Sequence, residues 1–166
     1  GFERVVGIDL DPVHLSIADG FFECSEGCQL VAADAVEWVQ DGGDGDRYDL
    51  IIDDLYSEED FYPVRMAPVD RDWCHRLVDM LSPVGMLIFN LIEPSKVRSL
   101  PPARDAELRK NFPYRRVFSI EGYENRVVVF SPNPMDSDLL REGLLRIGRI
   151  HPRCYGVGRH YQSRSL

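Results

Sequence analysis

The stretch "VVGIDLDPVHLSIADGFF", Val5 to Phe22, joins an apolar run to a helical pattern through two acids and a proline. The run is short and rich in β-branched residues, which predicts a buried strand over residues 4–10. Asp11 is a favourable N-cap, and Pro12 suits the first turn of a helix. A strand that leads directly into a helix is the first half of a β-α-β unit, so this stretch predicts an α/β fold.

The same alternation of strand and helix patterns continues along the chain. Further strands are expected over residues 29–32, 48–55, 86–92, 114–120 and 125–131. Helices are expected after Pro12 and over 34–39, 70–81, 103–111 and 135–147, with an irregular acidic loop over 57–68. Such alternation predicts a mostly parallel sheet with helices on both faces. The short "EGYE" segment between the last two strands predicts that this pair is antiparallel.

Charge is distributed unevenly in a chain whose net charge is −9. Acids are concentrated in residues 34–60, whereas six arginines lie between Arg141 and Arg164. The acidic balance argues against non-specific binding to nucleic acid, so no nucleic-acid partner is expected. The basic tail is expected to be solvated, and contact with an acidic partner or RNA stays open as the alternative.

Four scattered cysteines and the lack of long apolar runs constrain the environment of the chain. No apolar run approaches the ~20 residues that a membrane-spanning helix needs, so no membrane partner is expected. Cys24 and Cys28 have the spacing of half a zinc site, but no matching Cys/His pair follows. We therefore expect no metal, and reduced thiols in a cytoplasmic protein.

Acidic side chains follow three successive predicted strands. Asp9 and Asp11 end the first strand, Asp34 follows the second, and Asp53 and Asp54 end the third. Ligands of open parallel sheets bind beyond the carboxyl ends of the strands, where a carboxylate can accept hydrogen bonds from a ribose diol. No glycine-rich loop or basic group is placed to hold phosphate. The pattern favours a nucleoside ligand without phosphates, although Asp11 and Asp34 could instead act only as helix caps.

Four successive motifs resemble those of class I S-adenosylmethionine-dependent methyltransferases, which have a Rossmann-like fold. They are "VVGIDLDP", "VAADAVEWV", "YDLIIDDLY" and "LSPVGMLIFNLI". The closer match is the spermidine-synthase-like branch, and "FPYRRVFSIEGYENRVVVF" looks most like members that methylate proteins. On this resemblance, residues 1–134 form a partial methyltransferase domain, and residues 135–166 form a C-terminal helix and basic tail.

The resemblance implies a role for each strand-end acid. Asp9 would hold the ribose hydroxyls of the cofactor, S-adenosylmethionine. Asp34 would accept a hydrogen bond from the adenine amine, and Ala35 would donate its backbone N–H to the ring. Asp53 is expected at the cofactor as well. Asp54 matches the acid that helps to deprotonate the attacking amine in aminopropyl-transferring members of the branch.

The function implied is methyl transfer from S-adenosylmethionine, with a protein amine as the expected acceptor. Asp54 and Tyr56 are the candidate catalytic residues because they would orient that acceptor. One alternative is an aminopropyltransferase that uses decarboxylated S-adenosylmethionine and a small amine. Glu58 lies one position beyond the second acid of that enzyme's pattern, which weakens this alternative. A second alternative is a non-catalytic interaction or scaffold domain.

The resemblance also defines what the chain lacks. The family begins with a strand and a glycine-rich loop that holds the methionine part of the cofactor, and neither is present before Val5. We therefore expect an N-terminally truncated domain that binds the cofactor poorly and is inactive by itself, with transferase activity in a full-length product. Formation of a homodimer stays open.

Overall fold

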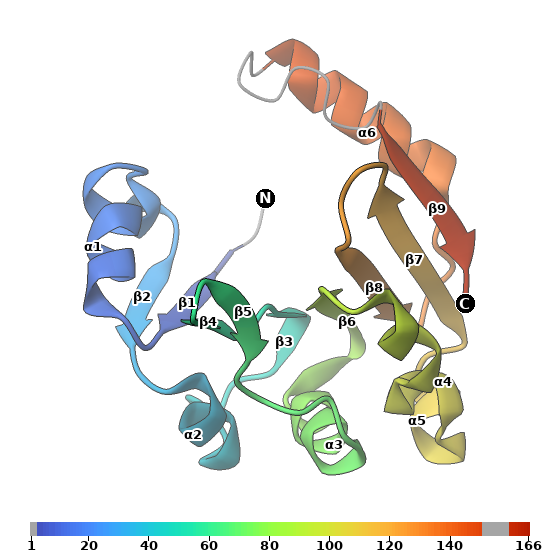
Figure 1. Cartoon of the computed structure of the whole chain (residues 1–166), viewed down its shortest axis with the longest axis horizontal. Helices are drawn as coiled ribbons and strands as arrows, with labels where there is room; N and C mark the ends of the chain where they lie inside the picture. Colours follow the sequence, from blue (N-terminus) through green and yellow to red (C-terminus); the bar gives the residue numbers. More distant parts are fainter. Residues whose placement is uncertain (1–2, 151–159) are drawn as a thin grey trace. The chain divides into compact units, whose positions relative to one another are not determined.

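The computed structural model describes residues 3–150 and 160–166 of the chain (Figure 1). The chain divides into two compact units, Gly1–Asp46 and Arg47–Leu166. We call them the first and the second unit and describe each by itself.

The first unit is a β-α-β-α arrangement. Its elements are β1 (Val6–Asp9), α1 (Pro12–Gly20), the 3₁₀ turn η1 (Cys24–Glu26), β2 (Gln29–Ala32) and α2 (Ala35–Gln40). The two strands pair in parallel, with Val6 opposite Gln29 and Asp9 opposite Ala32. The parallel pairing fits the predicted unit, because a helix connects the two strands. Arg4 forms ion pairs with Asp44 and Asp46, which fastens the glycine-rich loop beyond α2 to the start of β1.

The second unit contains a five-stranded sheet with the order β3-β6-β8-β7-β9. Its strands are β3 (Tyr48–Asp53), β6 (Leu81–Leu91), β7 (Tyr114–Ile120), β8 (Arg126–Ser131) and β9 (Tyr161–Ser165). A separate hairpin consists of β4 (Tyr56–Glu59) and β5 (Tyr62–Arg65). The helical elements are α3 (Arg71–Asp79), η2 (Pro94–Ser99), α4 (Pro101–Arg104), α5 (Ala106–Asn111) and α6 (Ser137–Ile150).

The prediction of a mostly parallel sheet is wrong. In the five-stranded sheet β3 and β6 run parallel, whereas β8 is antiparallel to β6 and β7 is antiparallel to both β8 and β9. The predicted antiparallel pair over 114–131 is confirmed as β7 and β8. The antiparallel pairing of β7 with β8 has a local cause. A short turn at Gly122 (φ 85°) joins the two strands, and so short a connection forces antiparallel pairing. The fold is therefore α/β with a mixed sheet.

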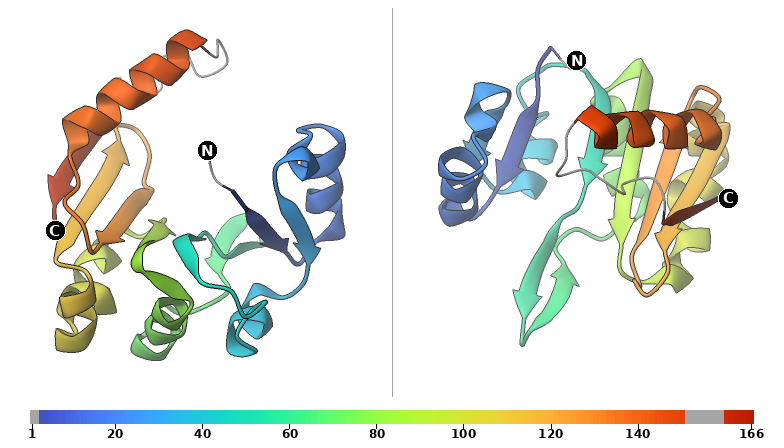
Figure 2. Two further views of the ribbon diagram at one scale, coloured as in Figure 1. Left: turned by 180° about the vertical axis from the view of Figure 1, so that it is seen from behind. Right: turned by 90° about the horizontal axis from the view of Figure 1, so that it is seen from above.

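The acidic segment expected to be an irregular loop is instead the β4–β5 hairpin. Two features of this segment explain why its sequence did not predict a hairpin. Its turn residues Asp60 and Phe61 have φ of 49° and 66°, a conformation that hairpin turns usually reserve for glycine or asparagine. Pro63 lies inside β5, where a proline argues against a strand. The hairpin projects from the sheet of the second unit, as the right-hand view of Figure 2 shows.

The buried core lies in the second unit. Its fully buried side chains include Leu87 and Phe89 of β6, Leu108 of α5, and Val128 and Phe130 of β8. Alternate residues of β6 are buried from Gly85 to Leu91, so one face of this central strand packs against the helices. The rings of Phe89 and Phe130 meet edge to face, with centroids 6.1 Å apart.

The C-terminal helix is fastened to the edge strand that follows it. Arg141 of α6 donates a hydrogen bond of 3.2 Å to the carbonyl of Tyr161, and its guanidinium lies 4.4 Å from the ring centroid of the same residue. The Tyr161 hydroxyl donates to the carbonyl of Ser137 at 3.0 Å. Part of the predicted basic tail is therefore the edge strand β9, and residues 151–159 lie outside the described residues. In the part of the chain that the structure describes, no helix is long and apolar enough to cross a membrane.

Candidate functional site

Asp9 ends β1 with a carboxylate held by two neighbours. Its Oδ1 accepts the backbone N–H of Asp11 at 2.8 Å, and its Oδ2 lies 3.2 Å from Nδ1 of His14. The side chain keeps 40% of its surface exposed. A carboxylate that is oriented by its own loop and still open to solvent can accept hydrogen bonds from a diol. Asp9 is thus the last residue of its strand, and its contact with a ribose stays a prediction.

The two other acids of the first unit are helix N-caps. Asp11 accepts the N–H of Val13 at 2.8 Å at the start of α1. Asp34 uses Oδ1 to accept the N–H groups of Val36 and Glu37, at 2.7 and 3.3 Å, at the start of α2. Among the described residues no hydrogen bond reaches Oδ2 of Asp34, so capping leaves one of its oxygens to accept from a ligand.

Asp53 ends β3 inside the second unit and is 3% exposed. Its Oδ1 accepts a hydrogen bond of 2.5 Å from Arg65 of β5, and its Oδ2 accepts one of 2.8 Å from Nε1 of Trp73 in α3. Both oxygens are thus engaged by side chains of the protein. The predicted direct contact between Asp53 and a cofactor stays a prediction, and the geometry shows that this carboxylate binds the hairpin and α3 to the end of β3.

Arg65 lies where the hairpin, β3 and β6 meet. Its guanidinium carbon is 5.4 Å from the ring centroid of Tyr56 and 6.0 Å from that of Phe89. Its side chain is 15% exposed, and Nε is buried without a hydrogen-bond partner in the described chain. A buried arginine with an ion pair on one edge and aromatic rings beside it is a rigid support for the residues around it.

Asp54 and Tyr56 converge on Asn90, which lies late in β6. The carboxylate of Asp54 is exposed and accepts a hydrogen bond of 2.9 Å from Nδ2 of Asn90. The Tyr56 hydroxyl donates to the carbonyl of Asn90 at 3.1 Å and accepts the N–H of Ile92 at 3.3 Å. Asn125, which lies just before β8, adds a contact of 3.3 Å to the Asn90 side chain. The two candidate catalytic residues are therefore in one network, with the Asp54 carboxylate facing solvent.

The predicted site residues are divided between the two units. The first unit holds Asp9, Asp34 and Ala35, and the second holds Asp53, Asp54 and Tyr56. Each group occupies the carboxyl end of a strand or the first residues after it, as the sequence predicts.

Three residues that sequence reasoning did not assign to the site contact it. They are His14 beside Asp9, and Arg65 and Trp73 on Asp53. The position of His14, three residues after the N-cap, is a usable signal, because the side chain of such a residue can reach back to the strand end. No feature of the sequence indicated that Arg65 contacts Asp53, because Arg65 lies in the segment that was expected to be irregular.

A second cluster of titratable side chains lies between α3 and α5. His75, Asp105 and Glu107 offer potential metal-ligating atoms within 4.8 Å of one another. Arg71 donates to the carboxylates of Asp105 and Glu107 at 2.9 and 3.1 Å, so an arginine already neutralises both acids. The backbone N–H of Leu108 and the Arg71 side chain lower the pKa of Asp105. The two acids are thus accounted for as a clamp between the helices, whereas Nε2 of His75 is buried and has no hydrogen-bond partner among the described residues.

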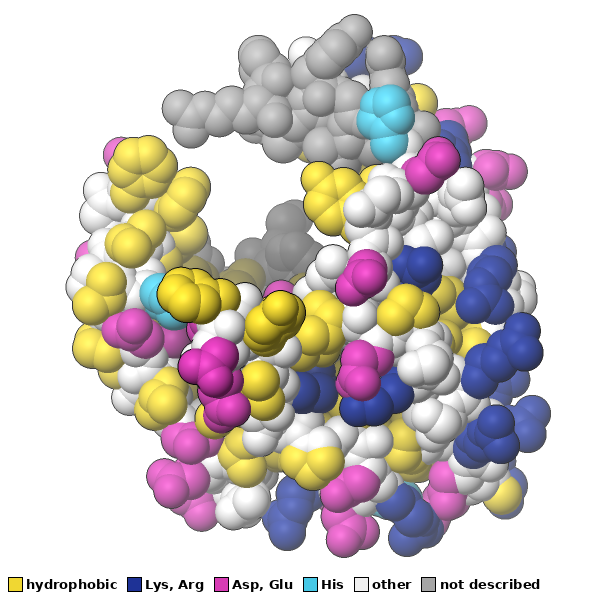
Figure 3. Space-filling model, viewed as in Figure 1, with side chains coloured by type: hydrophobic (Ala, Val, Ile, Leu, Met, Phe, Trp, Pro, Cys, Tyr) yellow, Lys and Arg dark blue, Asp and Glu magenta, His cyan; other side chains and the backbone are white. Residues whose placement is uncertain are grey.

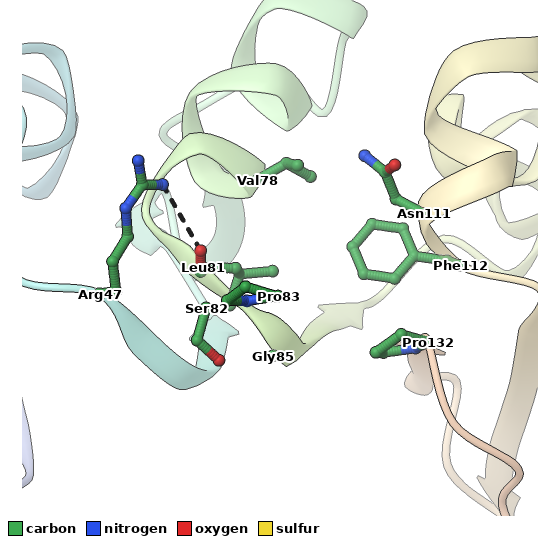
Figure 4. Close-up of a pocket in the computed structure, with 9 residues that line it drawn as sticks. All are labelled: Arg47, Val78, Leu81, Ser82, Pro83, Gly85, Asn111, Phe112 and Pro132. Atoms are coloured by element: carbon green, nitrogen blue, oxygen red, sulfur yellow. Dashed lines mark hydrogen bonds between the residues drawn. The ribbon is translucent and has the colours of Figure 1, made fainter.

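A pocket of about 450 Å³ opens at the opposite end of the five-stranded sheet from Asp53. It lies beside the first residues of β6, with Leu81 and Gly85 on one side and Phe112 and Pro132 on the other (Figure 4). Because Asp53 and Asp54 lie at the carboxyl end of β3, this pocket is separate from these two residues.

Solved structures of methyltransferases superpose on the chain, although no protein-family model and no curated protein sequence matches it. Human methyltransferase-like protein 13 in complex with S-adenosylhomocysteine (SAH) superposes with a TM-score of 0.60 at 20% identity, over 91% of this chain and 70% of that one. An O-methyltransferase from Bacillus cereus in complex with SAH gives 0.49 at 12% identity, over 77% and 62%. An N-methyltransferase from Bradyrhizobium japonicum gives 0.45 at 18% identity, over 80% and 75%.

The similarity to the human protein covers nearly the whole chain, both units included. At 20% identity it establishes architecture and not activity. The chain therefore has the α/β fold of a methyltransferase.

Proposed function

We propose that the chain is a methyltransferase domain that uses S-adenosylmethionine and transfers its methyl group to an amine. The observation that carries this proposal is the shared fold, together with a solvent-open carboxylate, Asp9, at the end of β1. Two of the similar proteins were crystallised with SAH, the product form of this cofactor.

The residues of the first unit fit the nucleoside part of such a cofactor. Asp9 would accept hydrogen bonds from the two ribose hydroxyls, with its orientation fixed by the N–H of Asp11 and by His14. Asp34 would accept from the adenine amine through Oδ2, while Oδ1 keeps capping α2. Ala35 is the first residue of α2, and the first N–H groups of a helix have no partner within it, so this N–H can donate to the ring.

The residues of the second unit fit an amine acceptor. The cofactor, when bound, supplies an electrophilic methyl group on a sulfonium. An amine attacks only through a free lone pair, so a carboxylate that takes its proton assists the reaction. Asp54 is exposed and aligned by Asn90, which suits that role. The proton of the Tyr56 hydroxyl is engaged by the carbonyl of Asn90, so we assign Tyr56 to orienting the acceptor.

Asp53 supports this arrangement without contacting the acceptor. Its carboxylate holds Arg65, which in turn lies beside the ring of Tyr56. Asp53 is therefore a positioning residue. Its loss should change the position of the Tyr56 ring more than it changes the affinity for the cofactor.

Ligand binding by a matched pair of variants tests the proposal. Asp9→Asn and Asp11→Asn make the same change of charge two positions apart, and asparagine keeps the N-cap that Asp11 provides. We expect SAH and 5′-methylthioadenosine to bind this chain weakly but to shift the NMR signals of β1 and α2, and Asp9→Asn to weaken both ligands by about tenfold or more. Asp11→Asn should change affinity less than about twofold.

Two results would count against the proposal. One is the absence of any shift with either nucleoside, and the other is an equal loss in the two variants. Spermidine formation from putrescine and decarboxylated S-adenosylmethionine would instead support the aminopropyltransferase alternative.

A further inference from the structure

The β4–β5 hairpin exposes a large apolar surface at its tip and along β5. Phe61 is 93% exposed and Tyr62 is 75% exposed, and Val64 and Met66 continue this surface at 37% and 50%. Contiguous exposed apolar patches mark interaction sites more often than singly exposed apolar side chains do. Figure 3 shows hydrophobic side chains beside acidic ones in the region of β4 and β5.

The backbone of the turn presents the ring of Phe61 outward. Asp60 and Phe61 both have positive φ, which glycine adopts freely and a bulky side chain does not. Strain of this kind persists where the conformation serves a purpose, and its effect here is to place an aromatic ring at the end of the hairpin.

Three acids flank the rings without a countercharge. Glu58, Glu59 and Asp60 are exposed, and no cation of residues 3–150 or 160–166 forms an ion pair with any of them. An apolar tip flanked by free carboxylates is complementary to a segment that carries both cations and apolar side chains. It would repel anionic lipid and nucleic acid, and a chain of net charge −9 also repels its own copies.

The register of the hairpin places one of these acids beside the exposed apolar side chains. Tyr56 pairs with Arg65 and Glu58 pairs with Pro63, whereas Glu59 pairs with Tyr62. Side chains alternate between the two faces of a strand, so Glu58 shares the face of Tyr56 and Arg65, and Glu59 shares the opposite face with Tyr62. A cation held by Glu59 would therefore lie beside the exposed ring of Tyr62.

We infer that the hairpin is the docking surface for a cationic polypeptide segment, gripped by Phe61 and Tyr62 and aligned by Glu59. A polypeptide fits better than a small diamine, because two largely exposed rings offer more apolar surface than a diamine can cover. This inference goes beyond the proposed function and does not rest on it.

Binding of a designed peptide to the whole chain tests the inference. The probe is a ten-residue peptide that alternates lysine with leucine and phenylalanine and carries a fluorescent label. A peptide with glutamate at every lysine position is its counterpart. Fluorescence anisotropy without any cofactor should show binding of the lysine peptide, weaker at high salt, and no binding of the glutamate peptide.

Two variants remove the same charge from opposite faces of β4. Glu59→Gln should weaken binding of the lysine peptide by about twofold to fivefold, the range of one exposed ion pair, and Glu58→Gln by less, because Glu59 shares the face of Tyr62. Phe61→Asn removes the ring but keeps a residue that tolerates positive φ, so the turn survives, and binding should fall by about fivefold or more. Circular dichroism checks that each variant is folded.

Three outcomes would overturn the inference. They are no binding of the lysine peptide, equal effects of Glu58→Gln and Glu59→Gln, and dimerisation that depends on Phe61, which would make a second copy the occupant. The peptide experiment uses no cofactor, so it is independent of the SAH titration. Peptide binding without SAH binding would contradict only the proposed function, and SAH binding without peptide binding would contradict only the docking surface.

Discussion

Arg65 donates a hydrogen bond of 2.5 Å to Asp53, and the side chains of the two residues are 15% and 2% exposed. The pair joins the base of the β4–β5 hairpin to the end of β3. It also determines where the ring of Tyr56 lies, because the guanidinium is 5.4 Å from that ring. The candidate acceptor site therefore depends on a largely buried ion pair.

Arg65→Met should destabilise the second unit strongly. It leaves the carboxylate of Asp53 buried without a countercharge, and breaking a buried pair in this way costs about 3–5 kcal/mol. Arg65→Lys keeps the charge but cannot reproduce the planar fork, so we expect an intermediate loss. Urea unfolding followed by circular dichroism measures both. Arg98→Met, at an exposed position, is the control and should change stability by less than about 0.5 kcal/mol.

Trp73→Phe tests the second partner of Asp53. Phenylalanine fills much of the same volume but cannot donate the 2.8 Å hydrogen bond from Nε1 to Oδ2. Because the acceptor is a buried charge, we expect a loss of about 1.5–3 kcal/mol in the free energy of unfolding. Trp38→Phe is the matched control, since Trp38 is only partly buried. An equal loss in both variants would show that ring size and not the hydrogen bond matters.

Much of the fold was predictable because its signals are local. β2 and β7 were predicted with their observed bounds, and the strand-end acids lie where the pattern places them. The cap at Asp11 was also predicted, because an N-cap depends on the residue itself and on the helix that follows. The direction of the whole sheet was not predictable in the same way, because the pairing of β8 with β6 and of β9 with β7 joins segments that are distant in the sequence.

The part of the candidate site that was missed depends on contacts between distant segments. Arg65 and Trp73 reach Asp53 across twelve and twenty positions, and neither has a local signal. The turn at Phe61 has a positive φ at a position where hairpins usually have glycine or asparagine. The residue types of this segment therefore predicted a loop. Sequence reasoning thus found the acids and missed the residues that hold them.

Cys74 should resist alkylation in the native protein. Burial raises the pKa of its thiol to about 12, and the negative charges of Asp53 and Asp70 add to this effect. At pH 8 the thiol therefore stays protonated and enclosed, whereas Cys24 and Cys28 are partly exposed. Iodoacetamide labelling followed by mass spectrometry should modify Cys24 and Cys28 first and Cys74 only in denaturant.

The raised pKa of Cys74 also predicts how the free energy of unfolding changes with pH. The folded pKa of Cys74 lies above its ordinary value of 9.0, so the unfolded chain ionises first as pH rises. The contribution of the neutral thiol to stability is complete below about pH 9 and is lost between pH 9 and about 12. Cys74→Ala should remove this pH dependence, and an unchanged decline in that variant would contradict the assignment to Cys74.

Gly85→Ala should destabilise the chain because the backbone is too close at that position. A Cβ on Gly85 would lie 2.8 Å from the carbonyl oxygen of Tyr48 and 2.9 Å from Cδ2 of Leu81. The carbonyl belongs to the β3 backbone and has little freedom to move, so we expect a loss of about 1–3 kcal/mol. Gly143→Ala is the matched control inside α6, where no atom of the described residues, apart from the adjoining backbone of the helix itself, lies within 4 Å of the added carbon. That variant should be more stable than the wild type by roughly 0.5–1 kcal/mol, because alanine loses less backbone entropy in a helix. Urea midpoints that moved in the same direction for both variants would contradict the close approach of β3 and β6 at Gly85.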